Sequence, residues 1–283
     1  MSVKIDPSGR RSIQVEVEVP GTPEQVWEAI ATGAGVSSWF VPTEMEGRAG
    51  GIMTCHFAPG MDSKATITSW DPPHRLTADS ESFCSGGPTV ATEWTVEARS
   101  GGTCVVRVVH SLFASTGDWD DQLEGTESGW PAFFRILRLH LTHFRGQDCA
   151  MFMATGFASG SSTKVWEEMN GSLGLSDAPV GQKHQTGAGA PGLSGTVEAS
   201  HGGNHPFKLL LLDQPAPGAV VLNACPMGED QVYLSTAFYL YGKGAAEAAK
   251  KNEPLWKAWM TEHFGAAPEA ISAQNRPLPS DFV

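Results

Sequence analysis

The longest amphipathic pattern in the chain runs over residues 128–144, SGWPAFFRILRLHLTHF. The spacing of its apolar residues predicts a helix over this segment, because they recur every three or four positions on one face. Ser128 is the expected N-cap, and Pro131 fits the first turn. Five buried side chains at roughly 1.5–3 kcal/mol each would hold this helix on a partner surface. They are Trp130, Phe134, Leu137, Leu141 and Phe144.

Short segments of β-branched and alternating residues precede this helix, and turn residues separate them. The interruptions DPP, CSGGP and RSGG are typical of hairpin connections, so we expect an antiparallel sheet. Such a sheet must bury one face, and the long helix is the expected cover. The predicted strands occupy residues 50–57, 64–71, 74–82, 89–98 and 103–113.

A helix start signal lies upstream of these strands, in TPEQVWEAI. Thr22 can cap the helix, Pro23 fits its first position, and Gln25 completes a capping box with Thr22. The acidic segment 114–127, just before the long helix, is expected to be a loop. We therefore predict the order helix, antiparallel strands, loop, long helix for the first half of the chain.

The second half repeats this order. Trp166 corresponds to Trp27 at an offset of 166 − 27 = 139 residues, and Phe264 corresponds to Phe144 at an offset of 120. The second copy is therefore shorter by 139 − 120 = 19 residues. Strands are expected over 193–200, 207–213, 218–225 and 231–242, before a helix over 245–265. We predict two similar domains, residues 10–147 and 150–266, and a C-terminal tail, residues 267–283.

Composition and charge argue against several classes of function. Hydrophobic residues make up 41% of the 283 residues and charged residues 18%, which indicates a globular protein. The 31 acidic and 19 basic residues give a net charge of −12, which argues against binding a nucleic-acid backbone. No apolar run is long enough to span a bilayer, and the N-terminus lacks the apolar segment of a signal peptide.

The five cysteines stand apart and form no CxxC pair, which argues against a disulfide framework or a zinc site. His140 and His143 lie three residues apart, but the sequence places no third ligand beside them. We therefore expect a cytoplasmic protein with reduced thiols, no cofactor and no metal. The sequence does not specify an oligomeric state.

Six motifs occur in the order found in a known family: TPEQVWEAI, WFVP, EGRAGG, SWDPPHRL, TEWTVEARSGGTCVVRVVHS and EGTESGWPAFFRIL. Through them, residues 12–145 resemble the bacterial family named after homologue 1 of the activator of the 90-kDa heat-shock protein ATPase. That family belongs to the START-like, or SRPBCC, helix-grip superfamily. The resemblance implies an α+β fold, in which a curved, seven-stranded antiparallel sheet wraps round a long C-terminal helix, with two short helices near the N-terminus. The second half keeps the order without the motifs and is expected to be a degenerate tandem copy.

The superfamily binds lipids, polyketides, hormones and aromatic molecules between sheet and helix, so the resemblance implies a site there. Alternation places Trp94 and Val96 on one face of their strand, and Val108 and His110 together on the next. Cys55 or His56, and Phe57, are further candidates whose faces alternation does not fix. For any one apolar candidate, a place in the ordinary core is the more common case. The expected ligand-binding residues are Trp70, Trp94, Val96, Val108, His110, Trp130, Phe134, Leu137 and Leu141.

His110 is the main polar candidate, because a buried imidazole among valines needs a hydrogen-bond partner. Glu81, Glu93, Glu124 and Glu127 are the carboxylates that could supply one. His110 could anchor a ligand, act as a catalytic acid or base, or bond to a loop at the strand end.

Three functions remain open from the sequence. The leading hypothesis is binding of a small hydrophobic or aromatic molecule in the first domain. The alternative is a cyclase or dehydratase acting on a polyketide-like or aromatic substrate, with His110 as the catalytic residue. No hydrolase, metalloprotease, phosphate-loop or dinucleotide motif is present. A chaperone-regulating module ranks last, because only the family's name suggests it, and we expect no chaperone partner.

Overall fold

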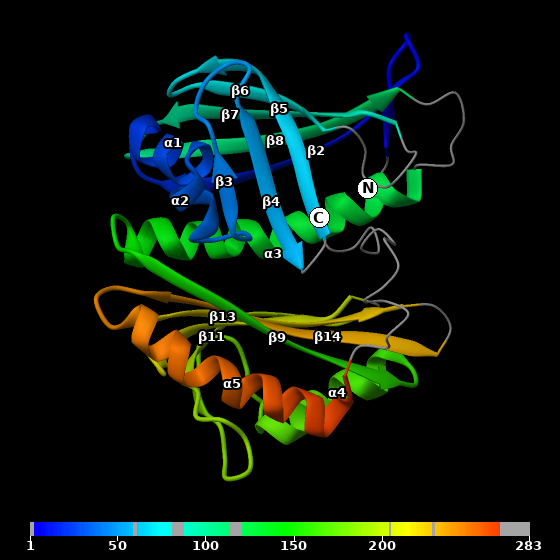
Figure 1. The fold of residues 1–283 in the computed structure, drawn as a ribbon, viewed down its shortest axis with the longest axis vertical. Coiled ribbons are helices and arrows are strands. Elements are labelled where there is room, and N and C mark those ends of the chain that lie inside the picture. The colour runs from blue at the N-terminus through cyan, green and yellow to red at the C-terminus, as the bar shows by residue number, and fades with distance from the viewer. Residues whose placement is uncertain are drawn as a thin grey trace. The chain divides into compact units, whose positions relative to one another are not determined.

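The computed structural model describes residues 3–58, 61–80, 88–113, 120–203, 205–227 and 230–266. The chain divides into two compact units, with the boundary between Arg145 and Gly146. We call the described residues before this boundary unit 1 and those after it unit 2. Figure 1 shows that each unit contains a sheet and a long helix lying along it, α3 in unit 1 and α5 in unit 2.

Unit 1 is built on an eight-stranded antiparallel sheet of order β1-β2-β8-β7-β6-β5-β4-β3. The predicted strands correspond to β4 through β8, whereas β1, β2 and β3 were missed. Because β1 has only two residues, strands β2 through β8 make the seven that the family resemblance implies. The bounds are β1 Lys4–Ile5, β2 Arg10–Pro20, β3 Thr43–Met45, β4 Ile52–Ala58, β5 Met61–Asp71, β6 Arg75–Ser80, β7 Val90–Arg99 and β8 Thr103–Phe113.

Two short helices follow β2, as the resemblance implies: α1 (Pro23–Ala31) and α2 (Gly33–Ser37). The predicted capping box is confirmed. The Thr22 side chain accepts a hydrogen bond from the backbone N–H of Gln25, and the Gln25 side chain accepts one from the backbone N–H of Thr22. These reciprocal bonds satisfy two amides that the first turn of α1 would otherwise leave unpaired.

The long helix begins earlier than predicted. Helix α3 spans Asp120–Leu139, so the prediction of a loop up to residue 127, with Ser128 as N-cap and Pro131 in the first turn, was wrong. The buried stripe continues upstream through Leu123 and Thr126, and the polar Thr126 hid this continuation. Asp120 favours the N-terminus of α3 because its carboxylate complements the helix dipole.

Two further features position α3. The carboxylate of Asp120 accepts a hydrogen bond from Nη1 of Arg11 on β2 at 2.6 Å, which ties the start of the helix to the sheet. At its other end α3 continues into a π-helical turn, η1 (His140–Phe144). Single π turns of this kind are frequent at functional sites, and His140 of η1 is described with the candidate site below.

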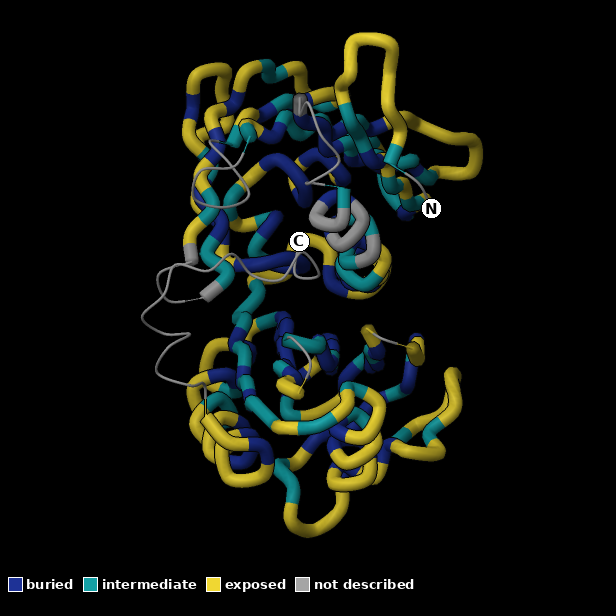
Figure 2. The backbone as a smooth tube through the Cα atoms, turned by 90° about the vertical axis from the view of Figure 1, so that its right-hand side faces the viewer, coloured by how far each residue is buried: buried dark blue, intermediate teal, exposed yellow. Residues whose placement is uncertain are grey.

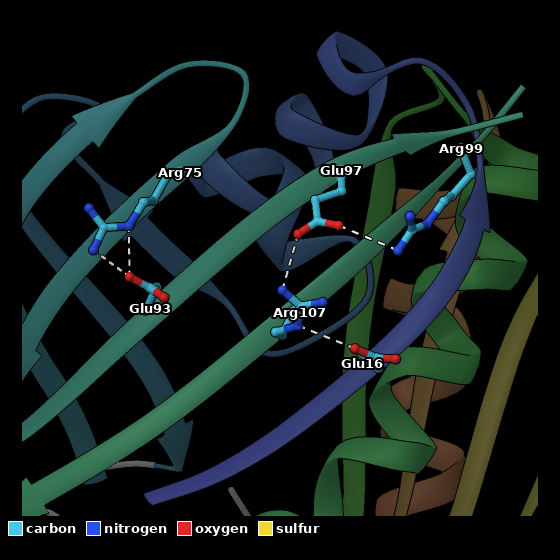
Figure 3. A network of polar contacts seen from close by, with 6 residues as sticks. All are labelled: Glu16, Arg75, Glu93, Glu97, Arg99 and Arg107. Atoms are coloured by element: carbon cyan, nitrogen blue, oxygen red, sulfur yellow. Dashed lines mark hydrogen bonds and ion pairs between the residues drawn. The ribbon is translucent and has the colours of Figure 1, made fainter. Parts of the chain in front are cut away.

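The sheet of unit 1 has one apolar and one charged face. Cross-strand register aligns Val15, Val108 and Trp94 on the face toward α3. The opposite face carries the ion pairs of Figure 3, in which Arg107 contacts both Glu16 and Glu97. Such largely exposed pairs contribute about 0–1 kcal/mol each, so the buried face supplies most of the stability. The other pairs in this network are Arg75 with Glu93 and Arg99 with Glu97.

Unit 2 has a six-stranded antiparallel sheet of order β10-β11-β12-β13-β14-β9. Its first helix, α4, follows a strand, β9, that the sequence analysis missed, as it also missed β10. The residues of α4 and α5 share one apolar core with the inner face of the sheet. The bounds are β9 Cys149–Ser159, α4 Ser162–Leu173, β10 Lys183–Gln185, β11 Ser194–His201, β12 Phe207–Gln214, β13 Gly218–Pro226, β14 Gln231–Tyr241 and α5 Ala245–Phe264.

The two units share one topology. In each, a long strand leads into a short helix, the following strands form an antiparallel meander, the last strand pairs with the first, and a long helix ends the unit. This arrangement confirms the predicted α+β helix-grip fold in tandem. Figure 2 shows buried segments on the strands and helices of each unit, and exposed residues in the turns and on the outer faces of the helices. No helix among the described residues is long and apolar enough to cross a membrane.

Candidate functional site

The apolar stripe of α3 faces the concave side of the sheet in unit 1. All five predicted stripe residues are buried, from Trp130 through Phe144. On the sheet, Trp94, Val96 and Val108 are also buried. The rings of Trp94 and Trp130 meet edge to face, with 5.1 Å between their centroids. The structure therefore brings the predicted helix residues and the predicted residues of β7 and β8 into one interface.

Aromatic rings dominate this interface and form what we call the aromatic cluster. Neighbouring rings in the cluster lie 4.6–6.4 Å apart between centroids, within the range of favourable edge-to-face and offset contacts. Trp130 lies at its centre and contacts every other member. The cluster consists of Trp39, Phe40, Trp94, Trp130, Phe133 and Phe134.

Of the remaining candidate residues, some contact the cluster and others lie apart from it. Trp70 packs edge to face on Trp27 of α1 at 5.1 Å, away from the rings around Trp130. Phe57 joins the cluster through an edge-to-face contact with Phe40 at 5.6 Å. Cys55 is buried beside the Thr43 hydroxyl, whereas His56 pairs with Asp62 at the surface.

His110 projects into this aromatic interface from β8. Its Nε2 accepts a hydrogen bond from Nε1–H of Trp130 at 3.0 Å, and its Nδ1 lies 2.9 Å from the hydroxyl of Thr92. Because an indole nitrogen can only donate, Nε2 carries the lone pair and Nδ1 carries the proton. The geometry thus assigns the tautomer, and Nδ1–H donates to Thr92.

Of the four carboxylates considered as partners of His110, the structure excludes Glu93. Glu93 lies on the opposite face of the sheet and pairs with Arg75. Alternation explains this, because Glu93 follows the inward-facing Thr92. Glu81 and the side chain of Glu124 lie outside the described residues.

Burial keeps His110 neutral. Only 5% of the residue is exposed, and desolvation lowers the pKa of its imidazole from 6.5 to about 4. Protonation would also place a proton on Nε2, against the N–H of Trp130. At neutral pH the ring therefore offers one acceptor and one donor without charge, which suits recognition of an uncharged polar group.

A second buried imidazole lies on η1. The Nε2 of His140 is 3.5 Å from the hydroxyl of Ser38, which itself donates to the carbonyl of Gly35 at 2.6 Å. Burial lowers the pKa of His140 to about 4. No cluster of three or more potential metal ligands occurs among the residues that the structure describes.

Sequence reasoning missed three contributors to the site. Trp39 and Phe40 entered only as part of the motif WFVP, although two adjacent aromatic residues after a short helix indicate a buried corner. Thr92 was missed because the search for a partner of His110 considered only carboxylates. Thr92 lies directly across from His110 on β7, a position that follows from strand register and not from the sequence alone.

Residues 20–142 match the sequence family described as activator of Hsp90 ATPase homolog 1-like protein. The matched segment lies within unit 1. The match includes α1, α2 and all but the last two residues of η1. It therefore contains the whole aromatic cluster and both buried imidazoles of unit 1. No functionally curated protein matches the chain in sequence.

Solved structures resemble about half of this chain or most of it. CalU16 from Micromonospora echinospora is 20% identical, with a TM-score of 0.40, and the match covers 50% of this chain and 83% of CalU16. The Aha1 dimer from Colwellia psychrerythraea is 18% identical, with a TM-score of 0.40, over 48% of this chain and 98% of that one. BexL, a di-domain ARO/CYC from the BE-7585A biosynthetic pathway, is 15% identical, with a TM-score of 0.42, over 91% of this chain and 100% of BexL.

Proposed function

We propose that unit 1 binds a small aromatic or hydrophobic molecule between the concave face of its sheet and α3. The observation that carries this proposal is the buried hydrogen bond from Trp130 to His110 within the aromatic cluster. It places a neutral acceptor and a neutral donor among apolar rings. Ligand sites typically combine an apolar lining with a few such polar groups.

The polar pair could exchange partners with a ligand. A hydroxyl on the ligand would donate to Nε2 of His110 in place of Trp130, and a carbonyl would accept from Nε1–H of Trp130. Neither exchange creates a charge, and a ligand hydroxyl that donates to Nε2 of His110 while its oxygen accepts from Nε1–H of Trp130 leaves neither group unpaired. The surrounding rings would contact the apolar body of the ligand through stacking and edge contacts.

The cluster reaches solvent on one side, which gives such a molecule a way in. Phe57 and Phe133 are only partly buried, and both contact Phe40. Phe40 itself lies parallel to Trp130 at 5.5 Å. A shift of the Phe57 and Phe133 rings would therefore expose the rings that surround Trp130 and His110.

His110 supports binding better than acid–base catalysis. A pKa of about 4 leaves its imidazole a weak base at neutral pH, and its lone pair is already engaged by Trp130. A cyclase or dehydratase role would use His110 to orient or polarise a substrate. Conversion of an aromatic-forming polyketide substrate by wild-type protein, abolished in His110→Ala with the fold retained, would favour that alternative.

The test uses 1-naphthol, a two-ring probe with one hydroxyl, titrated into the full chain by isothermal calorimetry. Phe134→Leu removes one ring of the cluster and keeps an apolar side chain. We expect this variant to bind 1-naphthol about threefold to tenfold more weakly. This is the usual contribution of an aromatic contact in addition to the burial of apolar surface area. Naphthalene should bind more weakly than 1-naphthol because it cannot donate to His110.

Trp70→Phe is the matched control, because Trp70 packs on Trp27 outside the cluster. It should bind 1-naphthol as the wild type does, and thermal unfolding should show that both variants are folded. Equal affinity of Phe134→Leu and wild type, or no binding at millimolar probe, would contradict the proposal.

A further inference from the structure

Strand β9 is one of the four edge strands of the two described sheets, and it differs from the other three (Figure 1). Strands β1, β3 and β10 have two or three residues, and each includes a charged residue: Lys4, Glu44 and Lys183. Strand β9 has eleven residues, CAMFMATGFAS, with no charge and no proline. Shortness, charge and proline are the usual protection of a sheet edge against pairing with another strand. Strand β9 has none of them, so its edge calls for a cover.

The ladder with β14 determines which backbone groups of β9 lie on the open edge. In an antiparallel pair, successive residues point their N–H and C=O groups alternately at the partner strand and away from it. The N–H of Phe157 points away from β14, because it donates to the carbonyl of Gly265 at 3.2 Å. The register with β14 is unbroken, so Met151, Met153 and Thr155 point the same way. Their N–H groups, which we call the open-edge amides, bond to no backbone group among the described residues.

The chain itself arrives at this edge when α5 ends. The end of α5 lies so close to β9 that a Cβ added at Gly156 would be 2.8 Å from Cβ of Phe264. The next residue, Gly265, makes the hydrogen bond to Phe157. The C-terminal tail, residues 267–283, lies outside the described residues and continues from this point. Because paired strands have the same rise per residue, its first five residues suffice to reach Met151.

We propose that residues 267–271 of the C-terminal tail pair with β9 as an additional antiparallel strand. The bond between Phe157 and Gly265 sets the register, since residue numbers rise along the tail as they fall along β9. The surface is thus an interaction site for a segment of the same chain, and it does not depend on the ligand proposed for unit 1. The pairs that face each other are Ala267 with Thr155, Glu269 with Met153 and Ile271 with Met151.

The sequence of the tail fits this register. The backbone nitrogen of Pro268 faces away from β9 in it, so the missing N–H costs no hydrogen bond. A shift by one residue would turn that nitrogen toward β9, where an N–H is needed. The added strand also carries Pro268 and Glu269, the proline and the charge that β9 itself lacks. The tail would therefore close the bare edge and present a protected one.

Backbone amide exchange, followed by NMR, compares the full chain with a chain that ends at Ala266. The open-edge amides should exchange about tenfold more slowly in the full chain, as expected when one or two hydrogen bonds close. The amides of Phe152 and Ala154 point at β14 and should exchange equally slowly in both chains. These two amides show that the sheet is folded in the truncated chain.

Two alanine-to-proline variants of the full chain test the register. Ala267→Pro places a proline ring where an N–H should donate to the carbonyl of Thr155, so the open-edge amides should lose most of their protection. Ala270→Pro is the matched control, because its nitrogen faces away from β9 in the proposed register. This variant should keep the protection of the wild type.

Equal exchange of the open-edge amides in the full and the truncated chain would overturn the proposal. Equal loss of protection in the two proline variants would also overturn it, because the tail would then not pair in this register. Protection that rises with protein concentration would show that a second copy of the chain covers β9 in place of the tail.

Discussion

Acid should destabilise unit 1 through its two buried imidazoles. His110 and His140 are 5% and 6% exposed, and burial lowers the pKa of each from 6.5 to about 4. In the unfolded chain both rings regain the ordinary value. Between pH 6.5 and pH 4 the unfolded state therefore binds protons that the folded state does not, and stability falls as the pH falls.

The size of the effect follows from the two pKa values. At pH 5 the unfolded state gains roughly a 30-fold statistical advantage per imidazole, or about 2 kcal/mol. Two imidazoles together give about 4 kcal/mol, a large part of the 5–15 kcal/mol that stabilises a typical domain. The full stability is present above pH 6.5.

Urea unfolding of the full chain at pH 8 and pH 5, followed by tryptophan fluorescence, measures this loss. His110→Gln keeps an acceptor for Trp130 and a donor for Thr92 but does not titrate. The difference in unfolding free energy between the two pH values should therefore shrink by about 2 kcal/mol in this variant. His143→Gln, on the exposed side of η1, is the control and should keep the wild-type difference.

Comparing pH differences within each variant removes any change in overall stability that the substitution itself causes. Other groups that titrate in this range contribute equally to wild type and variant, so they cancel. An unchanged pH difference in His110→Gln would refute the assignment of His110 as a buried neutral imidazole.

Three other substitutions, and one control, test the packing and surface contacts. Trp130→Phe removes the donor to His110 and should lower the unfolding free energy of unit 1 by about 1–3 kcal/mol at pH 8, and an unchanged urea midpoint would contradict this. In Gly156→Ala the new Cβ would lie 2.8 Å from Cβ of Phe264, so thermal unfolding should show a loss of about 1–3 kcal/mol in unit 2. Gly187→Ala meets nothing within 4 Å and should change little. Arg107→Met removes two surface ion pairs and should cost at most about 2 kcal/mol, less in 1 M salt. A larger, salt-independent loss would be inconsistent with the ion pairs of Figure 3.

The fold could be predicted where local sequence and burial agree. Alternation between one buried and one exposed face revealed β7 and β8, and the box at Thr22 marked the start of α1. The start of α3 was misplaced because Thr126 interrupts the apolar stripe although it is fully buried. Strand β2 was missed although apolar and polar residues alternate over residues 13–19. The pairing of β2 with β8, and of β9 with β14, identifies both strands.

Part of the candidate site could also be predicted from the periodicity of the sequence. Helical and strand periodicity correctly placed Trp130, Phe134 and Trp94 toward one another, because periodicity determines the direction of a side chain. Periodicity could not predict that Trp39, in the corner after α2, joins the cluster. It also could not predict that Trp70 lies outside the cluster. The partner of His110 depends on strand register, which places Thr92 opposite it and which the sequence does not state.

The location of a bound aromatic molecule tests the central claim most directly. With 1-naphthol saturating the methyl-labelled full chain, intermolecular NOEs should connect the naphthol protons to the methyl groups of Val108, Leu137 and Leu141, which lie between sheet and helix in unit 1. NOEs only to residues outside this interface, or none at saturation, would contradict the account.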